Sequence, residues 1–276
     1  LGEGGVIRNL TIDGVVKNER SRNQYVAGIA GTCKGLIAGC VNLAEISGGS
    51  YVGGIVGSAD KTCRIENSVN QGSVTASAER AGGICGVLYA EGSQAVSGCC
   101  NFGKVQAKGF AGGITGDFYS GAGIVNTYNR GEVISQGISG GIAGNFRSGT
   151  MNHVYHAGTV KGAQNGTGSI AGRLEWAGGS RTFDQVFWLE GSAESEIGNT
   201  GGYSISGQAQ KMSEEELKSV DLGNAYTEDR PPYINDGYPV LKWQAGEVFE
   251  PEKPESRPDA WDGKETSQPQ QKDGIY

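Results

Sequence analysis

The two histidines of the chain are the residues best suited to metal chemistry. His153 and His156 lie three positions apart in the stretch His-Val-Tyr-His. Residues three apart in a strand face opposite sides, so the two imidazoles could share a metal ion only if the strand broke between them. The glycine-rich nonapeptide with a recurring Asp that builds calcium-binding solenoids is also absent. We therefore expect no metal ion and no cofactor.

The six cysteines could form disulfides or bind zinc. No Cys-x-x-Cys pair occurs, and Cys99 and Cys100 are adjacent, so a zinc site is not expected. Cys40 and Cys99 stand where related stretches have Ser or Thr, which indicates small, interchangeable packing residues. We expect buried free thiols, with Cys33 and Cys63 as the one pair whose bridging needs a direct test.

Catalysis on polysaccharides would need paired carboxylates, or a base beside a cation. The charged residues occur singly along the sequence and are not concentrated in neighbouring repeats. They include Lys104, Asp117, Arg130, Glu132 and Arg147. Surface solvation explains such a distribution, so we expect no catalytic residue and no enzyme. The alternatives are a carbohydrate-active β-helix enzyme, either a polysaccharide lyase or a glycosidase, and a glycan-binding module.

The elements that position these residues come from a repeat. A Gly-Gly-Ile-x-Gly pattern or a close variant recurs six times, and its isoleucines are 26, 29, 30, 28 and 28 residues apart, at Ile29, Ile55, Ile84, Ile114, Ile142 and Ile170. Short stretches of strand-forming residues separate turn residues in each unit, and no helical period is present. Stacked units of this kind predict an all-β fold, a right-handed parallel β-solenoid of about six to seven coils.

The isoleucines are expected to form an interior ladder, with each rung beneath the next. The position after each Ile is always small and should face the opposite side in a strand, which predicts a flat outer face. Its residues are Ala30, Val56, Cys85, Thr115, Ala143 and Ala171.

An asparagine recurs in step with the isoleucine, at Asn42, Asn70, Asn101 and Asn129, and His156 takes its place in the next unit. Stacked asparagines can bond to each other and to the backbone of neighbouring coils, which predicts a structural amide ladder. A ligand-binding role for the column is the alternative.

The repeat weakens after residue 172, where large aromatic residues appear and the first Trp is Trp176. Residues 182–188 resemble a seventh, modified coil, and residues 213–218 start with a Ser-x-x-Glu capping box and should form a helix. The aromatics should seal the solenoid core, and a sugar-stacking platform is the alternative. We expect solenoid repeats at 1–190, a cap with one short helix at 191–245, and at 246–276 a Pro/Glu-rich linker with the start of a next module.

The formal net charge is −7 and the isoelectric point is near 5.0. Both values argue against nucleic acid and against an anionic membrane surface as partners. No apolar stretch approaches the length of a membrane span, so membrane insertion is not expected. The chain opens at Leu1 without a signal-peptide pattern, and we interpret it as a fragment of a longer polypeptide with neighbouring domains.

Two paired motifs carry a family resemblance: Gly-Gly-Ile-Thr-Gly at 112–116 and Asn-Arg-Gly-Glu-Val at 129–133. Together they resemble the GLUG-motif repeats of large bacterial cell-surface proteins, among them IgA-specific metallopeptidases. The segment at 236–243 is similar to the end of such modules in surface proteins of gut anaerobes. The resemblance implies a β-solenoid, a secreted or cell-wall-associated location, and a spacer or adhesin role toward host or microbial glycans or surface proteins. The peptidase signature His-Glu-x-x-His is absent, so the resemblance brings no catalytic residue.

Overall fold

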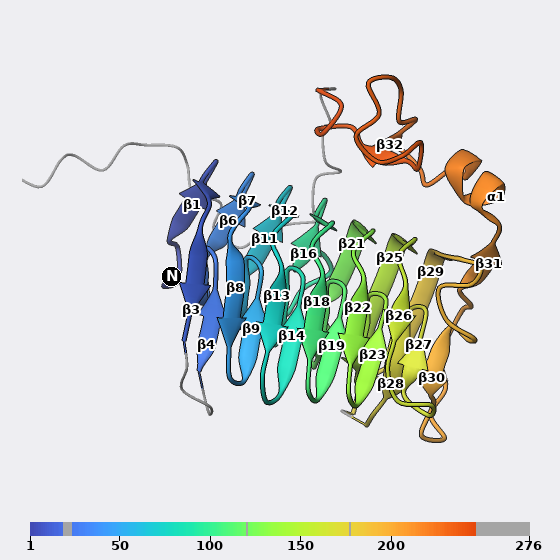
Figure 1. Ribbon diagram of the computed structural model, residues 1–276, viewed down its shortest axis with the longest axis horizontal. Coiled ribbons are helices and arrows are strands. Elements are labelled where there is room, and N and C mark those ends of the chain that lie inside the picture. Colours follow the sequence, from blue (N-terminus) through green and yellow to red (C-terminus); the bar gives the residue numbers. More distant parts are fainter. Residues whose placement is uncertain (19–23, 120, 177, 247–276) are drawn as a thin grey trace, which may run out of the picture.

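In the computed structural model the chain winds into a rod of about seven coils, built almost entirely of parallel strands (Figure 1). The structure describes residues 1–18, 24–119, 121–176 and 178–246. The expected linker at 247–276 lies outside the described residues. Each of the first six coils crosses four sheets, named A to D here.

Sheet A has twelve strands, because most coils cross it twice, on either side of a turn. Its strands are β1 (Val6–Arg8), β2 (Thr11–Ile12), β6 (Leu36–Ala38), β7 (Val41–Asn42), β11 (Arg64–Glu66), β12 (Val69–Asn70), β16 (Val96–Ser97), β17 (Cys100–Asn101), β21 (Gly123–Asn129), β25 (Gly149–His156), β29 (Arg181–Leu189) and β31 (Gln210–Met212).

Sheets B, C and D follow sheet A in the first six coils, and the seventh coil adds strands only to sheets A and D. Sheet B contains β3 (Val15–Lys17), β8 (Glu45–Gly48), β13 (Val74–Ala76), β18 (Val105–Ala107), β22 (Val133–Ser135) and β26 (Val160–Lys161). Sheet C contains β4 (Tyr25–Ala27), β9 (Tyr51–Gly53), β14 (Arg80–Gly82), β19 (Phe110–Gly112), β23 (Ile138–Gly140) and β27 (Thr167–Gly168). Sheet D contains β5 (Ala30–Cys33), β10 (Val56–Ala59), β15 (Cys85–Leu88), β20 (Thr115–Phe118), β24 (Ala143–Phe146), β28 (Ala171–Leu174) and β30 (Ile197–Asn199).

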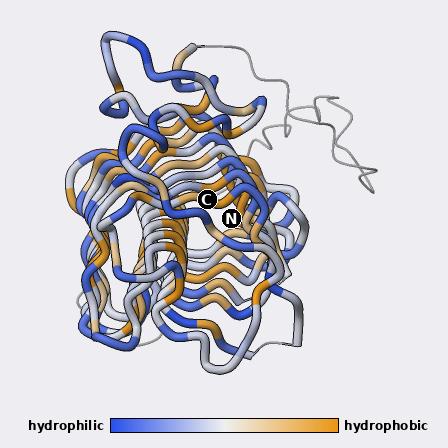
Figure 2. The backbone as a smooth tube through the Cα atoms, turned by 90° about the vertical axis from the view of Figure 1, so that its right-hand side faces the viewer, coloured by the Kyte–Doolittle hydropathy of each residue, from blue (hydrophilic) through white to orange (hydrophobic). Residues whose placement is uncertain are grey.

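The register of these sheets follows the sequence repeat, so that equivalent residues of adjacent units pair. Val74 pairs with Val105 in sheet B, and Asn70 pairs with Asn101 in sheet A. Viewed along the rod, successive coils therefore trace the same path (Figure 2). The chain is a β-solenoid, as the spacing predicted.

The Gly-Gly-Ile motif forms a bend between sheets C and D. The N–H of Ile55 and that of Val56 both donate to the carbonyl of Ile84, at 3.0 and 2.9 Å. Consecutive N–H groups of a regular strand point to opposite neighbours, so this shared acceptor interrupts the alternation.

The residue after each Ile consequently points inward. Five of these positions are completely buried, namely Val56, Cys85, Thr115, Ala143 and Ala171, and Ala30 at the first bend is partly buried. The expected flat outer face of small residues was wrong, because two successive side chains at the bend enter the core.

The rod encloses two apolar cores. One lies between sheets A and D and contains the isoleucines of the bends, together with Ile37, Ile65 and Phe118. The other lies between sheets B and C and contains Val52, Ile46 and Val74. Five of the bend isoleucines are fully buried, and Ile29 is partly buried. From Ile29 to Ile142, the N–H of each isoleucine donates to the carbonyl of the isoleucine in the next coil.

The seventh coil is present, and strand β29 pairs in parallel with β25. Its Phe183 and Trp188 cover the core between sheets A and D. Strands β30 and β31 then add to sheets D and A, so parallel pairing continues to Met212, past residue 190 where we expected the solenoid to end.

The segment after Met212 lies along one flank of the rod rather than over its end (Figure 1). It contains helix α1 (Glu214–Ser219), whose Ser213 and Glu216 form the expected capping box, and the antiparallel pair β32 (Tyr226–Thr227) and β33 (Val240–Leu241). Its apolar side chains pack on the outside of sheet A, where the third core contains Leu217, Leu222, Tyr226, Tyr238 and Leu241 against Val69, Cys100, Tyr128, Tyr155 and Phe187. Only part of the aromatic set therefore seals the solenoid, since Trp176 and Tyr233 are exposed.

Candidate functional site

The four repeating asparagines form one buried column. Each side-chain nitrogen donates to the amide oxygen of the next asparagine, over 2.6 Å from Asn42 to Asn70, 2.6 Å from Asn70 to Asn101 and 2.7 Å from Asn101 to Asn129. Each nitrogen also donates to the backbone carbonyl two residues ahead. Both hydrogens of every amide are thus used inside the protein, which leaves none for a ligand.

His156 ends this column. The Nδ2 atom of Asn129 lies 3.0 Å from Nδ1 of His156, so the imidazole accepts there and carries its proton on Nε2. Burial lowers the pKa of His156 to about 3, because a charged ring would be desolvated. His156 is therefore a neutral member of the ladder, and its Nδ1 is not free to bind a metal ion.

His153 lies apart from the ladder, on the flank of the rod. Its backbone has a φ of 52°, a left-handed conformation that turns strand β25, and its Nδ1 contacts Oδ1 of Asn152. Within the described part of the chain, no group of three or more His, Cys, Asp or Glu side chains could hold a metal ion.

The cysteines are buried and free. A hydrogen bond between the two thiols joins Cys33 to Cys63, and it lowers the pKa of Cys33. The pair singled out from the sequence is therefore adjacent in space, with both thiols reduced.

The expectation that charged residues are scattered singly was wrong. Four charged side chains from four successive coils meet beside sheet D, and we call them the arginine–aspartate cluster. They are Arg80, Asp117, Arg147 and Glu175. Arg80 Nε and Arg147 Nε each lie 3.0 Å from an oxygen of Asp117, which is 1% exposed. The sequence hides this cluster because its members are 28 to 37 residues apart.

The arginine–aspartate cluster has the character of an ion-pair network rather than of an acid–base pair. Asn145 donates to both carboxylates, over 3.2 Å to Asp117 and 2.8 Å to Glu175. Burial opposes ionisation of Glu175, but the Asn145 hydrogen bond and the charge of Arg147 outweigh it and lower the pKa of Glu175. Both carboxylates are thus engaged in ion pairs and in hydrogen bonds from Asn145.

Aromatic rings flank the cluster along sheet C. Tyr25 and Tyr51 stack with centroids 5.0 Å apart, and the Arg80 guanidinium lies between Tyr51 and Phe110, at 5.1 and 5.4 Å from their centroids. A sugar binds to the face of an aromatic ring, whereas here the Arg80 guanidinium lies against Tyr51 and Phe110, and the ring of Tyr25 also lies against Tyr51. Tyr51 and Phe110 are therefore poorly suited to sugar stacking.

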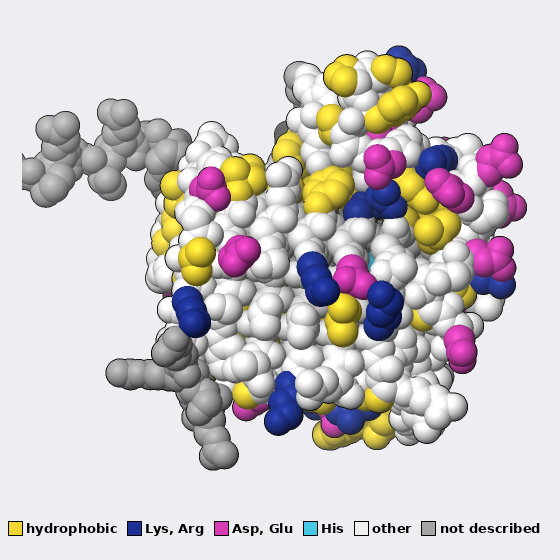
Figure 3. Space-filling model, in the orientation of Figure 1, with side chains coloured by type: hydrophobic (Ala, Val, Ile, Leu, Met, Phe, Trp, Pro, Cys, Tyr) yellow, Lys and Arg dark blue, Asp and Glu magenta, His cyan; other side chains and the backbone are white. Residues whose placement is uncertain are grey.

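A second, smaller charge cluster lies on sheet B. Glu132 pairs with Lys161 at 2.7 Å and with Lys104 at 3.2 Å, and charged side chains gather at the centre of this face (Figure 3). Hydrogen bonds from Lys161 and Lys104 lower the pKa of Glu132. The cluster joins three coils across the surface.

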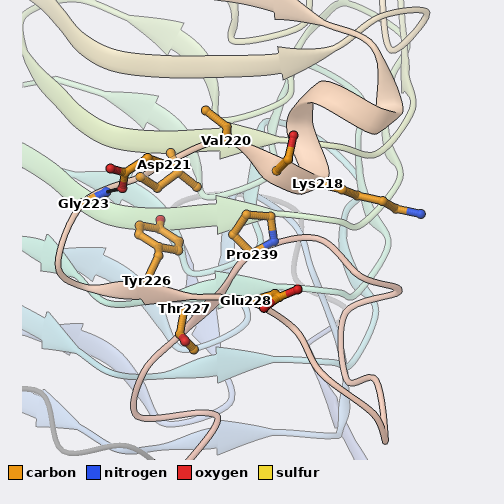
Figure 4. Close-up of a pocket in the computed structure, with 10 residues that line it drawn as sticks. Lys218, Val220, Asp221, Gly223, Tyr226, Thr227, Glu228 and Pro239 are labelled. Carbon is orange, nitrogen blue, oxygen red and sulfur yellow. Dashed lines mark hydrogen bonds between the residues drawn. The ribbon is translucent and has the colours of Figure 1, made fainter.

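Three cavities surround the C-terminal part of the chain. The first, of about 370 Å³, lies between Lys218 and Pro239 within residues 213–246, which we call the flank segment. Its side chains are engaged elsewhere: Lys218 extends away from the cavity and pairs with Glu214, and the Asp221 carboxylate accepts from the N–H of Gly223 (Figure 4).

The second cavity, of about 340 Å³, lies between the coils and the flank segment and contains His153. The third, of about 380 Å³, lies at the end of the rod, where Trp188, Glu194 and Glu196 line it. Burial raises the pKa of Glu196, and a hydrogen bond from the N–H of Ala209 partly offsets this effect.

Residues 48–75 match the family model of the GLUG motif. The matched stretch begins at the end of β8 and ends inside β13, so it corresponds to one coil with its Gly-Gly-Ile bend and its ladder residue Asn70. This chain carries a GLUG repeat.

Comparison with solved structures finds a similar fold in a proposed immunoglobulin A1 protease from Bacteroides ovatus. The two chains are 19% identical with a TM-score of 0.46, over 88% of this chain and 76% of the other. No curated protein matches the GLUG-repeat chain in sequence. Among the described residues, no helix is long and apolar enough to span a membrane.

Proposed function

We propose that the chain is a non-catalytic extracellular module of a bacterial surface protein, acting as a rigid spacer or as an adhesive face. The observation that carries this proposal is the asparagine ladder, which links four successive coils and then His156 by side-chain hydrogen bonds inside the rod. Bending the rod would break bonds at every coil, so the ladder favours stiffness. The ion clusters likewise join coils rather than present reactive groups.

The proposed location is secreted or attached to the cell wall, in line with the GLUG-motif match. Proposed partners are host or microbial glycans or surface proteins, with neighbouring domains of the same polypeptide at the ends. Small-angle scattering of residues 1–246 should match the profile calculated from the structure, in which about seven coils, each about 4.8 Å thick, form one rigid stack. The profile of a flexible chain would contradict the proposal.

A carbohydrate-active enzyme, either a polysaccharide lyase or a glycosidase, is the second candidate. One observation favours it, because Glu194 and Glu196 line the same cavity beside Trp188 and burial raises the pKa of Glu196. A raised pKa suits a general acid. We expect neither reducing ends nor unsaturated products from a panel of polysaccharides. Product formation that stops in Glu196→Gln would replace our proposal with the enzyme.

A further inference from the structure

The flank of the rod turns at the same point in every coil, through one residue with a left-handed backbone. This column consists of Asn9, Gly39, Asn67, Gly98, Asn126, His153 and Gln185, whose φ values lie between 47° and 63°. Asn and Gly tolerate this conformation best, which explains most of the column. The second cavity lies over its members Asn126 and His153.

The cavity takes its two walls from distant parts of the chain. Residues 222–225 of the flank segment form one wall. Three successive coils form the other, each with two residues: Gln94 and Ser97, Val125 and Asn126, and Asn152 and His153. Its volume of about 340 Å³ lies within the range of small-molecule sites.

The wall formed by the flank segment is held in place before any ligand arrives. Tyr226 donates from its hydroxyl to the carbonyl of His153 at 3.0 Å, and Asp221 accepts from the N–H of Gly223 at 2.8 Å. Leu222 and Ala225 are buried in the third core. A preformed wall lowers the ordering cost of binding.

The lining is polar and carries no Lys, Arg, Asp or Glu. Within the described part of the chain, the side-chain amides of Gln94, Asn126 and Asn224 have no hydrogen-bond partner. Each amide offers two donors and an acceptor, which matches the adjacent hydroxyls of a sugar. Val125 adds an apolar patch for a C–H face. A charged ligand would find no counter-ion in this lining.

We propose that this cavity binds one or two residues of a neutral glycan, with Gln94, Asn126 and Asn224 as its hydrogen-bonding residues. The inference rests on the proposed adhesive role and gives that role a place on the rod. The arginine–aspartate cluster and its covered rings are not involved.

Calorimetric titration of residues 1–246 with neutral mono- and disaccharides of glucose, galactose, mannose and N-acetylhexosamines tests this inference, with sialyllactose as the charged comparison. At least one neutral sugar should bind. The double variant Asn126→Gly with Gln94→Ala should weaken that binding at least tenfold. Gly98 occupies the position of Asn126 in the preceding coil, so glycine keeps the backbone conformation there.

Asn67→Gly is the matched control, since it makes the same change in the same column outside the cavity and should leave affinity unchanged. Circular dichroism and thermal unfolding verify that each variant folds. Absence of binding by every neutral sugar would overturn the inference, and so would equal affinity in the double variant. Neither result would alter the scattering profile, so failure of this site is distinguishable from failure of the rod proposal.

Discussion

At the scale of single residues, buried polar groups are tied to neighbours one coil away. Asn101 donates to Asn129 and to the carbonyl of Gly103 and accepts from Asn70, all without exposure to solvent. Such groups cost free energy when one partner is removed, because the other partner remains buried and unsatisfied. The ladder is therefore sensitive to the loss of its members.

Replacing Asn101 with Ala should lower the free energy of unfolding by about 3 kcal/mol or more, since it leaves several buried groups unpaired. Asn42→Ala, at the start of the ladder, removes one bond to another asparagine and two bonds to the backbone of Ala44, and it should also cost about 3 kcal/mol. Urea unfolding followed by circular dichroism measures both. A loss below about 1 kcal/mol at both positions would contradict an energetic role for the ladder.

His156 should make stability depend on pH. Its pKa is about 3 in the folded protein and 6.5 in the unfolded chain, so the unfolded chain takes up the proton first as the pH falls. The contribution of the neutral ring is complete above pH 6.5 and is lost toward pH 3, by at most about 1.4 kcal/mol per pH unit.

His156→Asn, which places the ladder residue of the other coils there, should remove this part of the acid dependence. Unfolding free energies at pH 7 and pH 4, compared between variant and parent, measure it. His153→Asn is the control, because asparagine suits its left-handed backbone. An unchanged pH dependence in His156→Asn would refute the assignment.

At the scale of elements, the bend between sheets C and D depends on glycine. A Cβ atom on Gly112 would overlap the carbonyl oxygen of Thr115 and lie 2.6 Å from the N–H nitrogen of Gly144. These are backbone atoms of the bend and of the next coil, and they cannot move away as a flexible side chain could.

Gly112→Ala should therefore destabilise the protein by at least about 3 kcal/mol, as severe backbone clashes do. Gly121→Ala is the matched comparison, since nothing lies within 4 Å of a Cβ there, and it should unfold like the parent. Thermal unfolding of the two variants checks the difference. A stable Gly112→Ala protein would show that the bend relaxes.

The coils could be predicted from recurring residues such as Ile55, Ile84 and Asn70, because the period of a repeat can be read from a single sequence. The sequence did not predict the direction of Val56, since alternation holds only in regular strands and the motif is a bend. It missed the pairing of Arg80 with Asp117, which depends on alignment between coils. The left-handed column was visible as recurring Asn and Gly, but its cavity needed the flank segment as a second wall.

At the scale of the whole molecule, each coil pairs only with the coils before and after it. Stability in such a stack is nearly a sum over units and their interfaces. The number of coils can therefore change while the interfaces between them stay the same.

Deleting residues 30–55, one complete unit, should leave a folded rod shorter by about 4.8 Å, because Ile29 would then precede Val56 in an intact bend. Deleting residues 30–42, half of a unit, should abolish folding, since it places strands of different sheets in register. Scattering and circular dichroism distinguish the outcomes. A folded half-unit deletion would contradict the stacking rule.

Trp243 donates from its indole nitrogen to the carbonyl of Gly98 at 3.0 Å, so the last described residues rest beside the fourth coil. Tension drawn through this end of the chain would reach the molecule near its middle. The axis of the coil stack would then lie across the direction of the pull. The side of the stack, rather than its end, would face an approaching surface. This geometry supports the proposed adhesive role more than the proposed spacer role.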